Sequence, residues 1–165
     1  MKKIVSLVLI AVMLLSFTSC MKRAYEFDPK EFTESGMTIT LTEGFWVYDE
    51  DIGDLLVAYE AKEALVMIMK EEFNTVEGME DLTEVEYGEF WQTANKDYDM
   101  DELATVDGLT QTKYTAEVDG ITFVYLNFIF KGPDAFWVFQ FASTSANYEN
   151  YKPYFVEWAK SVKFS

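Results

Sequence analysis

A long apolar run between Ile121 and Phe141 constrains the fold of this chain more than any other segment. Both alternating sets of residues in its first half are largely apolar, and alternate residues of a β-strand point to opposite faces of the sheet. The segment 121–130 is therefore predicted to be a strand in the middle of a sheet, covered on both faces. Gly132-Pro133-Asp134 predicts a turn into a second strand at 135–142, so the two segments form an antiparallel hairpin.

Further strands are predicted on the amino-terminal side of this hairpin. Asp119-Gly120 is a two-residue hairpin signal that follows an alternating strand at 110–118, and it extends the antiparallel meander. Alternation also predicts strands at 37–42, 55–60 and 64–70. A buried helix is the alternative for the last of these segments, but polar residues on either side of it favour a strand.

Two helices are predicted from capping and periodicity. Thr83 and Glu86 form a capping box, and the helix that they begin is expected to run to about Tyr98. Its stripe of Tyr87, Trp91, Ala94 and Tyr98 is expected to pack on the sheet, with a ligand pocket as the alternative. A second helix is expected at 145–160, and Pro153 either begins its main part or kinks it.

These elements predict one α+β domain at 37–165, with a mostly antiparallel sheet of about six strands and helices on both faces. The chain has 165 residues, no histidine and a single cysteine, Cys20. The composition therefore excludes a disulfide framework and removes the usual zinc ligands and the commonest general base. A formal net charge of -16 makes nucleic acid a poor partner.

The segment 1–20 predicts where in the cell the protein is located. Lys2 and Lys3 precede an apolar core that ends at Phe17, which is the pattern of a secretory signal and is short for a permanent membrane span. Ser19 and Cys20 resemble the end of the bacterial lipoprotein signal, in which the cysteine is acylated and becomes the first residue. Cys20 is therefore the expected lipid-attachment site, and the alternative is a plain secreted or uncleaved protein.

The polar segment 21–36 suits a short tether between this anchor and the domain. The expected location is thus the extracytoplasmic face of a bacterial cell membrane, reached through the lipid on Cys20.

The domain itself resembles the PsbP-like fold, which is shared with Mog-type Ran-binding proteins and bacterial DcrB-like lipoproteins. The resemblance rests on a strand before a Gly-Phe/Trp turn, a helix after the next strands, and a long hairpin followed by an aromatic helix and a short tail. The matching segments are Ile39–Trp46, the helix after Asp81-Leu82-Thr83, Phe136–Phe141, Tyr148–Lys160 and Ser161–Phe164. This resemblance implies a fold, and it implies an accessory or docking protein rather than an enzyme.

Two acidic clusters are candidates for a cation site. One consists of Asp97, Asp99, Asp101 and Glu102, and the other of Asp49, Glu50, Asp51 and Asp54. The first lacks the glycine and the final glutamate of an EF-hand, so an EF-hand is excluded, and a solvated acidic loop is the simpler interpretation of both.

Trp46 and Tyr48 stand beside the second cluster, where they could form a binding edge, although Trp46 could instead fill the core. We expect a non-enzymatic binding or docking module with no cofactor and with an unknown protein or small-molecule partner. An accessory protein that binds Ca²⁺ or Mn²⁺ through the acidic loops is the alternative, and a carboxylate-dependent hydrolase is a third hypothesis.

Overall fold

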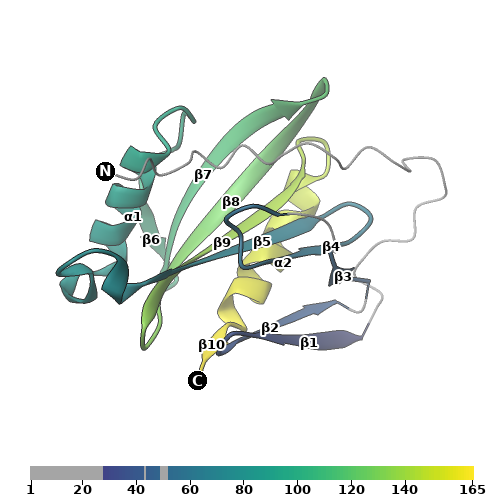
Figure 1. Cartoon of the computed structure of the whole chain (residues 1–165). Helices are drawn as coiled ribbons and strands as arrows, with labels where there is room; N and C mark the ends of the chain where they lie inside the picture. Colours follow the sequence, from purple (N-terminus) through teal and green to yellow (C-terminus); the bar gives the residue numbers. More distant parts are fainter. Residues whose placement is uncertain (1–27, 43, 49–51) are drawn as a thin grey trace.

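The computed structural model describes residues 28–42, 44–48 and 52–165. These residues form two antiparallel sheets and two α-helices (Figure 1). The elements are β1 (Pro29–Glu34), β2 (Met37–Thr42), β3 (Trp46–Val47), β4 (Val57–Glu60), β5 (Leu65–Glu72), η2 (Phe73–Thr75), η3 (Met79–Asp81), α1 (Glu84–Ala94), β6 (Ala104–Val106), β7 (Leu109–Val118), β8 (Ile121–Lys131), β9 (Ala135–Thr144), α2 (Tyr148–Lys160) and β10 (Lys163–Phe164).

The larger sheet has seven strands in the order β3-β4-β5-β9-β8-β7-β6. The predicted central hairpin is confirmed as β8 and β9, and nine of the ten residues of β9 are buried. Asp119 and Gly120 have positive φ angles of 50° and 80°, so they form the tight turn that the sequence predicted between β7 and β8. The hairpin of β4 and β5 is also confirmed, and no helix forms at 65–70.

A second sheet of three strands has the order β1-β2-β10 and brings the two ends of the domain together. The sequence predicted a single sheet of about six strands, whereas the described residues form two sheets. β2 pairs with β1 and β10 instead of joining the larger sheet, and the pairing of β2 with β10 joins segments that lie far apart in the sequence. β1 lies inside the stretch 21–36 that was predicted to be a tether, so part of this stretch is a strand of the second sheet. β1 shows no alternation of apolar and polar residues, because Phe32 is its only buried residue, so the sequence did not predict this strand.

Helix α1 begins as predicted. The hydroxyl of Thr83 accepts a hydrogen bond from the backbone N–H of Glu86 at 3.2 Å, and the Glu86 carboxylate accepts one from the backbone N–H of Thr83 at 2.8 Å. The Glu86 carboxylate accepts hydrogen bonds from both the backbone N–H and the hydroxyl of Thr83, and these two bonds lower the pKa of Glu86. The helix ends at Ala94 rather than near Tyr98, because the side chain of Asn95 donates to the carbonyl of Trp91 at 2.9 Å and the chain turns away.

Helix α2 runs without interruption from Tyr148 to Lys160 and contains Pro153, so Pro153 does not begin a separate helix. The helix begins three residues later than predicted. It packs against odd-numbered residues of β9, with the rings of Phe155 and Phe141 5.5 Å apart. Helix α1 packs against even-numbered residues, with Tyr87 stacked on Phe136 at 4.2 Å. The core is thus built from both sets of side chains of the central hairpin.

Candidate functional site

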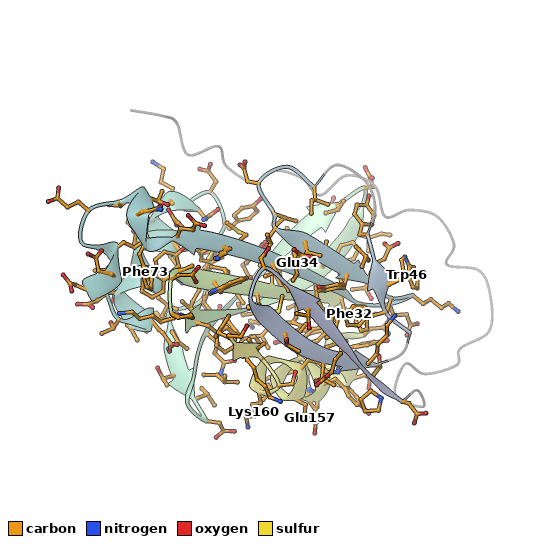
Figure 2. All side chains as sticks on the ribbon, turned by 60° about the horizontal axis from the view of Figure 1, so that its bottom comes forward. Phe32, Glu34, Trp46, Phe73, Glu157 and Lys160 are labelled. Carbon is orange, nitrogen blue, oxygen red and sulfur yellow. The ribbon has the colours of Figure 1, made fainter. Side chains whose placement is uncertain are left out.

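The edge strand β3 carries the most exposed aromatic side chain of the described residues. β3 pairs only with β4, through Trp46 opposite Glu60 and Val47 opposite Tyr59. Trp46 is 50% exposed and Val47 is 51% exposed. In Figure 2 Trp46 and Phe73 lie at opposite ends of the molecule. An exposed tryptophan beside an exposed valine, on a strand that is paired on one side only, is a surface suited to a partner.

The indole of Trp46 is held in place rather than left to rotate. Its Nε1–H donates a hydrogen bond of 2.8 Å to Oε1 of Glu60, the residue opposite it on β4. A fixed aromatic ring loses little conformational entropy when it meets a partner, which is why tryptophan is common among residues that dominate binding energy. We call Trp46, Val47 and Glu60 the β3 edge.

Phe45 fills the core where Trp46 could have done so. Phe45 is 2% exposed, and its ring meets that of Trp158 on α2 at 5.1 Å in an edge-to-face arrangement. The side chain of Trp46 is therefore not needed for packing. Sequence reasoning left this choice open, because two adjacent aromatic residues after a glycine do not show which of them points inward.

The β3 edge continues into a row of side chains on one face of the larger sheet. Strand pairing places Trp46, Glu60 and Leu65 side by side, and the row goes on through Ala142 and Tyr125. Tyr114 completes it on β7, stacked on Tyr125 with ring centroids 4.6 Å apart. Tyr98, from the loop after α1, covers Tyr114 at 4.7 Å. Trp46 therefore lies at the exposed end of this row, and the buried residues Tyr125 and Tyr114 lie at its other end.

A second row of side chains, two residues further along the strands on the same face of the sheet, is polar and buried. Gln140, Asn127 and Thr112 are paired across β9, β8 and β7, and all three are at most 6% exposed. Asn127 donates to the carbonyl of Thr112 at 3.3 Å, while its side-chain oxygen has no partner among the described residues. Asn127 was not among the predicted site residues, although it interrupts the apolar pattern of β8. A buried unpaired acceptor of this kind is usually satisfied by water.

Burial controls the ionisation of the tyrosines on this face. Burial raises the pKa of Tyr114, and the neighbouring Tyr125 and Tyr98 raise it further, while the bond to Gln140 opposes the shift. The pKa of Tyr125 is raised by burial and by Tyr98. A tyrosine hydroxyl is neutral near pH 7 in any case, and the raised pKa values keep these two neutral at higher pH as well, so this face offers hydrogen bonds and aromatic rings rather than charge.

The first acidic cluster is dispersed along its loop. Asp101 pairs with Lys113 at 3.2 Å, and its backbone carbonyl accepts from Thr112 and Gln92 at 2.6 and 2.9 Å. Asp97, Asp99 and Glu102 are exposed, as is Asp54 of the second cluster. Asp49, Glu50 and Asp51 lie outside the described residues. Within the described residues, no three acidic side chains gather closely enough to hold a metal ion.

Cys20, the expected lipid-attachment site, lies outside the described residues, as do the whole signal segment and residues 21–27 of the predicted tether. In the part of the chain that is described, no helix has the length and apolar character needed to cross a membrane.

Comparison with solved structures supports the architecture. The chain is similar to cyanobacterial PsbP (CyanoP) from Synechocystis sp., whose solution structure matches with a TM-score of 0.56 and 13% identity, covering 90% of this chain and 99% of that one. The chain has a PsbP-like fold. No family model and no curated protein matches the sequence.

A crystal structure from Pseudomonas aeruginosa, described as a protein of unknown function and putative regulator, matches the PsbP-like domain with a TM-score of 0.42. Its identity is 8%, and the match covers 78% of this chain and 92% of that one. The match to the cyanobacterial structure alone confirms the fold predicted from the segments around Gly44, α1 and α2, at the level of the PsbP-like architecture.

Proposed function

We propose that this protein is a lipid-anchored, extracytoplasmic docking module that binds a protein partner through the β3 edge and performs no catalysis. The observation that carries the proposal is the half-exposed Trp46, whose indole is fixed by Glu60 on a strand that pairs on one side only. Interfaces gain most of their energy from a few such side chains, especially tryptophan, tyrosine and arginine.

The architecture presents this edge on a stiff support. We infer a sandwich with helices on both faces of the larger sheet, because α1 and α2 pack against alternate residues of β9. β4, which holds β3, pairs with β5, and β5 pairs along its whole length with the buried strand β9. A partner at the β3 edge would therefore meet a surface that changes little on binding.

The proposed anchor is tested by fatty-acid labelling in cells of the source organism. The protein is expected to incorporate an alkyne-tagged palmitate, and Cys20→Ser is expected to abolish the label because the thiol is the acceptor. Ser19→Ala is the matched control, since it keeps a small residue before the cysteine and should retain the label. Equal labelling of Cys20→Ser and the unmodified chain would show that Cys20 is not the attachment site.

The docking role is tested separately, by photo-crosslinking from Val47. Val47 is exposed and lies next to Trp46, so a reactive side chain there reports a partner without removing the tryptophan.

A further inference from the structure

Strand β1 is the longest edge strand of the two sheets that the described residues form. It has six residues and, among these residues, pairs only with β2, whereas the other edge strands, β3, β6 and β10, have two, three and two residues. β1 lies at the lower right of the molecule in Figure 1, and Phe32 and Glu34 mark it in Figure 2. All its residues except Phe32 are exposed, so its backbone is accessible to another strand.

The turn into β2 decides which backbone groups of β1 are free. Ser35 and Gly36 have φ angles of 50° and 87°, so β1 and β2 form a hairpin in which Glu34 and Met37 exchange backbone hydrogen bonds. Hydrogen-bonded pairs alternate along the hairpin, which directs the N–H and C=O groups of Glu31 and Thr33 away from β2. The same alternation turns the N–H of Thr40 to the other side, where it donates to Ser161 at 2.9 Å.

The side chains of β1 are arranged with opposite charges at its two ends. Lys30, Phe32 and Glu34 share one face, and the ring of Phe32 lies on that of Tyr59 at 4.6 Å. Lys30 and Glu34 take part in none of the ion pairs among the described residues, which are Lys70–Asp134, Lys113–Asp101 and Lys160–Asp107. The ammonium of Lys30 lies 4.7 Å from the centre of the Phe32 ring, and Glu34 accepts a hydrogen bond of 2.9 Å from the exposed hydroxyl of Ser35. Both charges therefore lie at the surface without an opposite charge among the described residues, so each can pair with a charge on a second strand.

We propose that two copies of this chain pair through β1 in an antiparallel, two-fold arrangement, with Phe32 opposite the partner's Phe32. The free backbone groups of Glu31 and Thr33 then bond those of the partner's Thr33 and Glu31. In the same register Lys30 lies opposite the partner's Glu34, and symmetry repeats this pair at the other end. One self-complementary strand therefore supplies backbone bonds, an aromatic pair and ion pairs together.

Neighbouring registers lack this complementarity. A shift by two residues in one direction places Glu31 opposite the partner's Glu31, where like charges repel. A shift in the other direction takes Lys30 past the end of the partner's strand. Pro29 and the charges of β1 are also features that discourage pairing with unrelated strands, so the edge favours its own copy over other partners.

The net charge of -16 opposes association in dilute solution, so the dimer is expected to be weak there. A membrane anchor would raise the local concentration of the two strands by confining both copies to one surface. The pairing itself goes beyond the proposed docking function and does not depend on it, because β1 and the β3 edge belong to different sheets.

The charge arrangement is tested by sedimentation equilibrium of the detergent-solubilised full chain. Lys30→Glu is expected to raise the dimer dissociation constant about tenfold or more, because both symmetry-related pairs become repulsive. Combining Lys30→Glu with Glu34→Lys exchanges the charges and should restore dimerisation. A chain that stays monomeric at every concentration, or a swap that fails to restore the dimer, would overturn the proposal.

The register is tested by disulfide formation in membranes from the producing cells. Lys30→Cys combined with Glu34→Cys should yield a crosslinked dimer, since residues opposite each other in a non-hydrogen-bonded pair have Cα atoms about 4.5 Å apart. Each single substitution should yield none, because the two identical positions would be about 13 Å apart. The unsubstituted chain reports any dimer formed through Cys20. Equal crosslinking of the double and single variants would contradict the register.

Discussion

Phe155→Ala is expected to lower the free energy of unfolding by about 3 to 5 kcal/mol, because it removes a fully buried ring from the centre of the core. The ring of Phe155 lies 5.5 Å from Phe141 of β9 and 5.7 Å from Trp158 on its own helix. The substitution leaves a cavity between α2 and the larger sheet and removes the contact of Phe155 with Phe141. Since a domain of this size is stable by only about 5 to 15 kcal/mol, the variant should unfold at a much lower denaturant concentration.

The matched control is Phe90→Ala on α1. Phe90 is 41% exposed, so its loss should cost less than about 1 kcal/mol. Chemical denaturation followed by circular dichroism measures both variants. Similar losses for Phe155 and Phe90 would mean that α2 does not pack on the sheet as described.

The domain is expected to unfold cooperatively as the pH rises above about 10, because several tyrosines are buried in their neutral form. Burial, with a smaller effect from Glu34, raises the pKa of Tyr59 to about 12. Burial, with Glu149 and Asp101, raises that of Tyr148 to about 12. The pKa values of Tyr87, Tyr114 and Tyr125 are raised as well, in each case chiefly by burial.

The direction of this effect follows from proton binding. Between about pH 10 and 12 the unfolded chain releases tyrosine protons that the folded chain keeps, so stability present below pH 10 is lost as the pH rises. Circular dichroism and tyrosinate absorbance, recorded together against pH, should change in one transition. Tyr125→Phe removes one such group and should gain stability relative to the unmodified chain above pH 10. Ionisation of the buried tyrosines with the fold intact would contradict the account.

The sequence predicts the central part of this fold well, because strong local signals agree there with burial. Alternating apolar residues define β8, Asp119-Gly120 defines the turn before it, and Thr83 with Glu86 defines the start of α1. Each of these signals lies within a few residues of the element that it specifies, so no distant contact is needed to interpret it.

The strands that were not predicted carry too few buried residues to give a pattern of their own. All three residues of β6 are exposed, and its pairing with β7 leaves no hydrophobic pattern in the sequence. β1 has only Phe32 as an inward-facing residue, and that ring is buried by Tyr59 of β4. In the candidate site, Glu60 is recognisable as the partner of Trp46 only when β3 and β4 are aligned.

The docking role is tested most directly by photo-crosslinking in living cells from a diazirine side chain at Val47, with Val106 as the matched position. The two residues are 51% and 50% exposed and lie on opposite edge strands of the larger sheet, β3 and β6. A discrete adduct with another protein is expected from Val47 and not from Val106, and Trp46→Ala should reduce its yield. No adduct from Val47, or equal adducts from both positions, would contradict a docking site at the β3 edge.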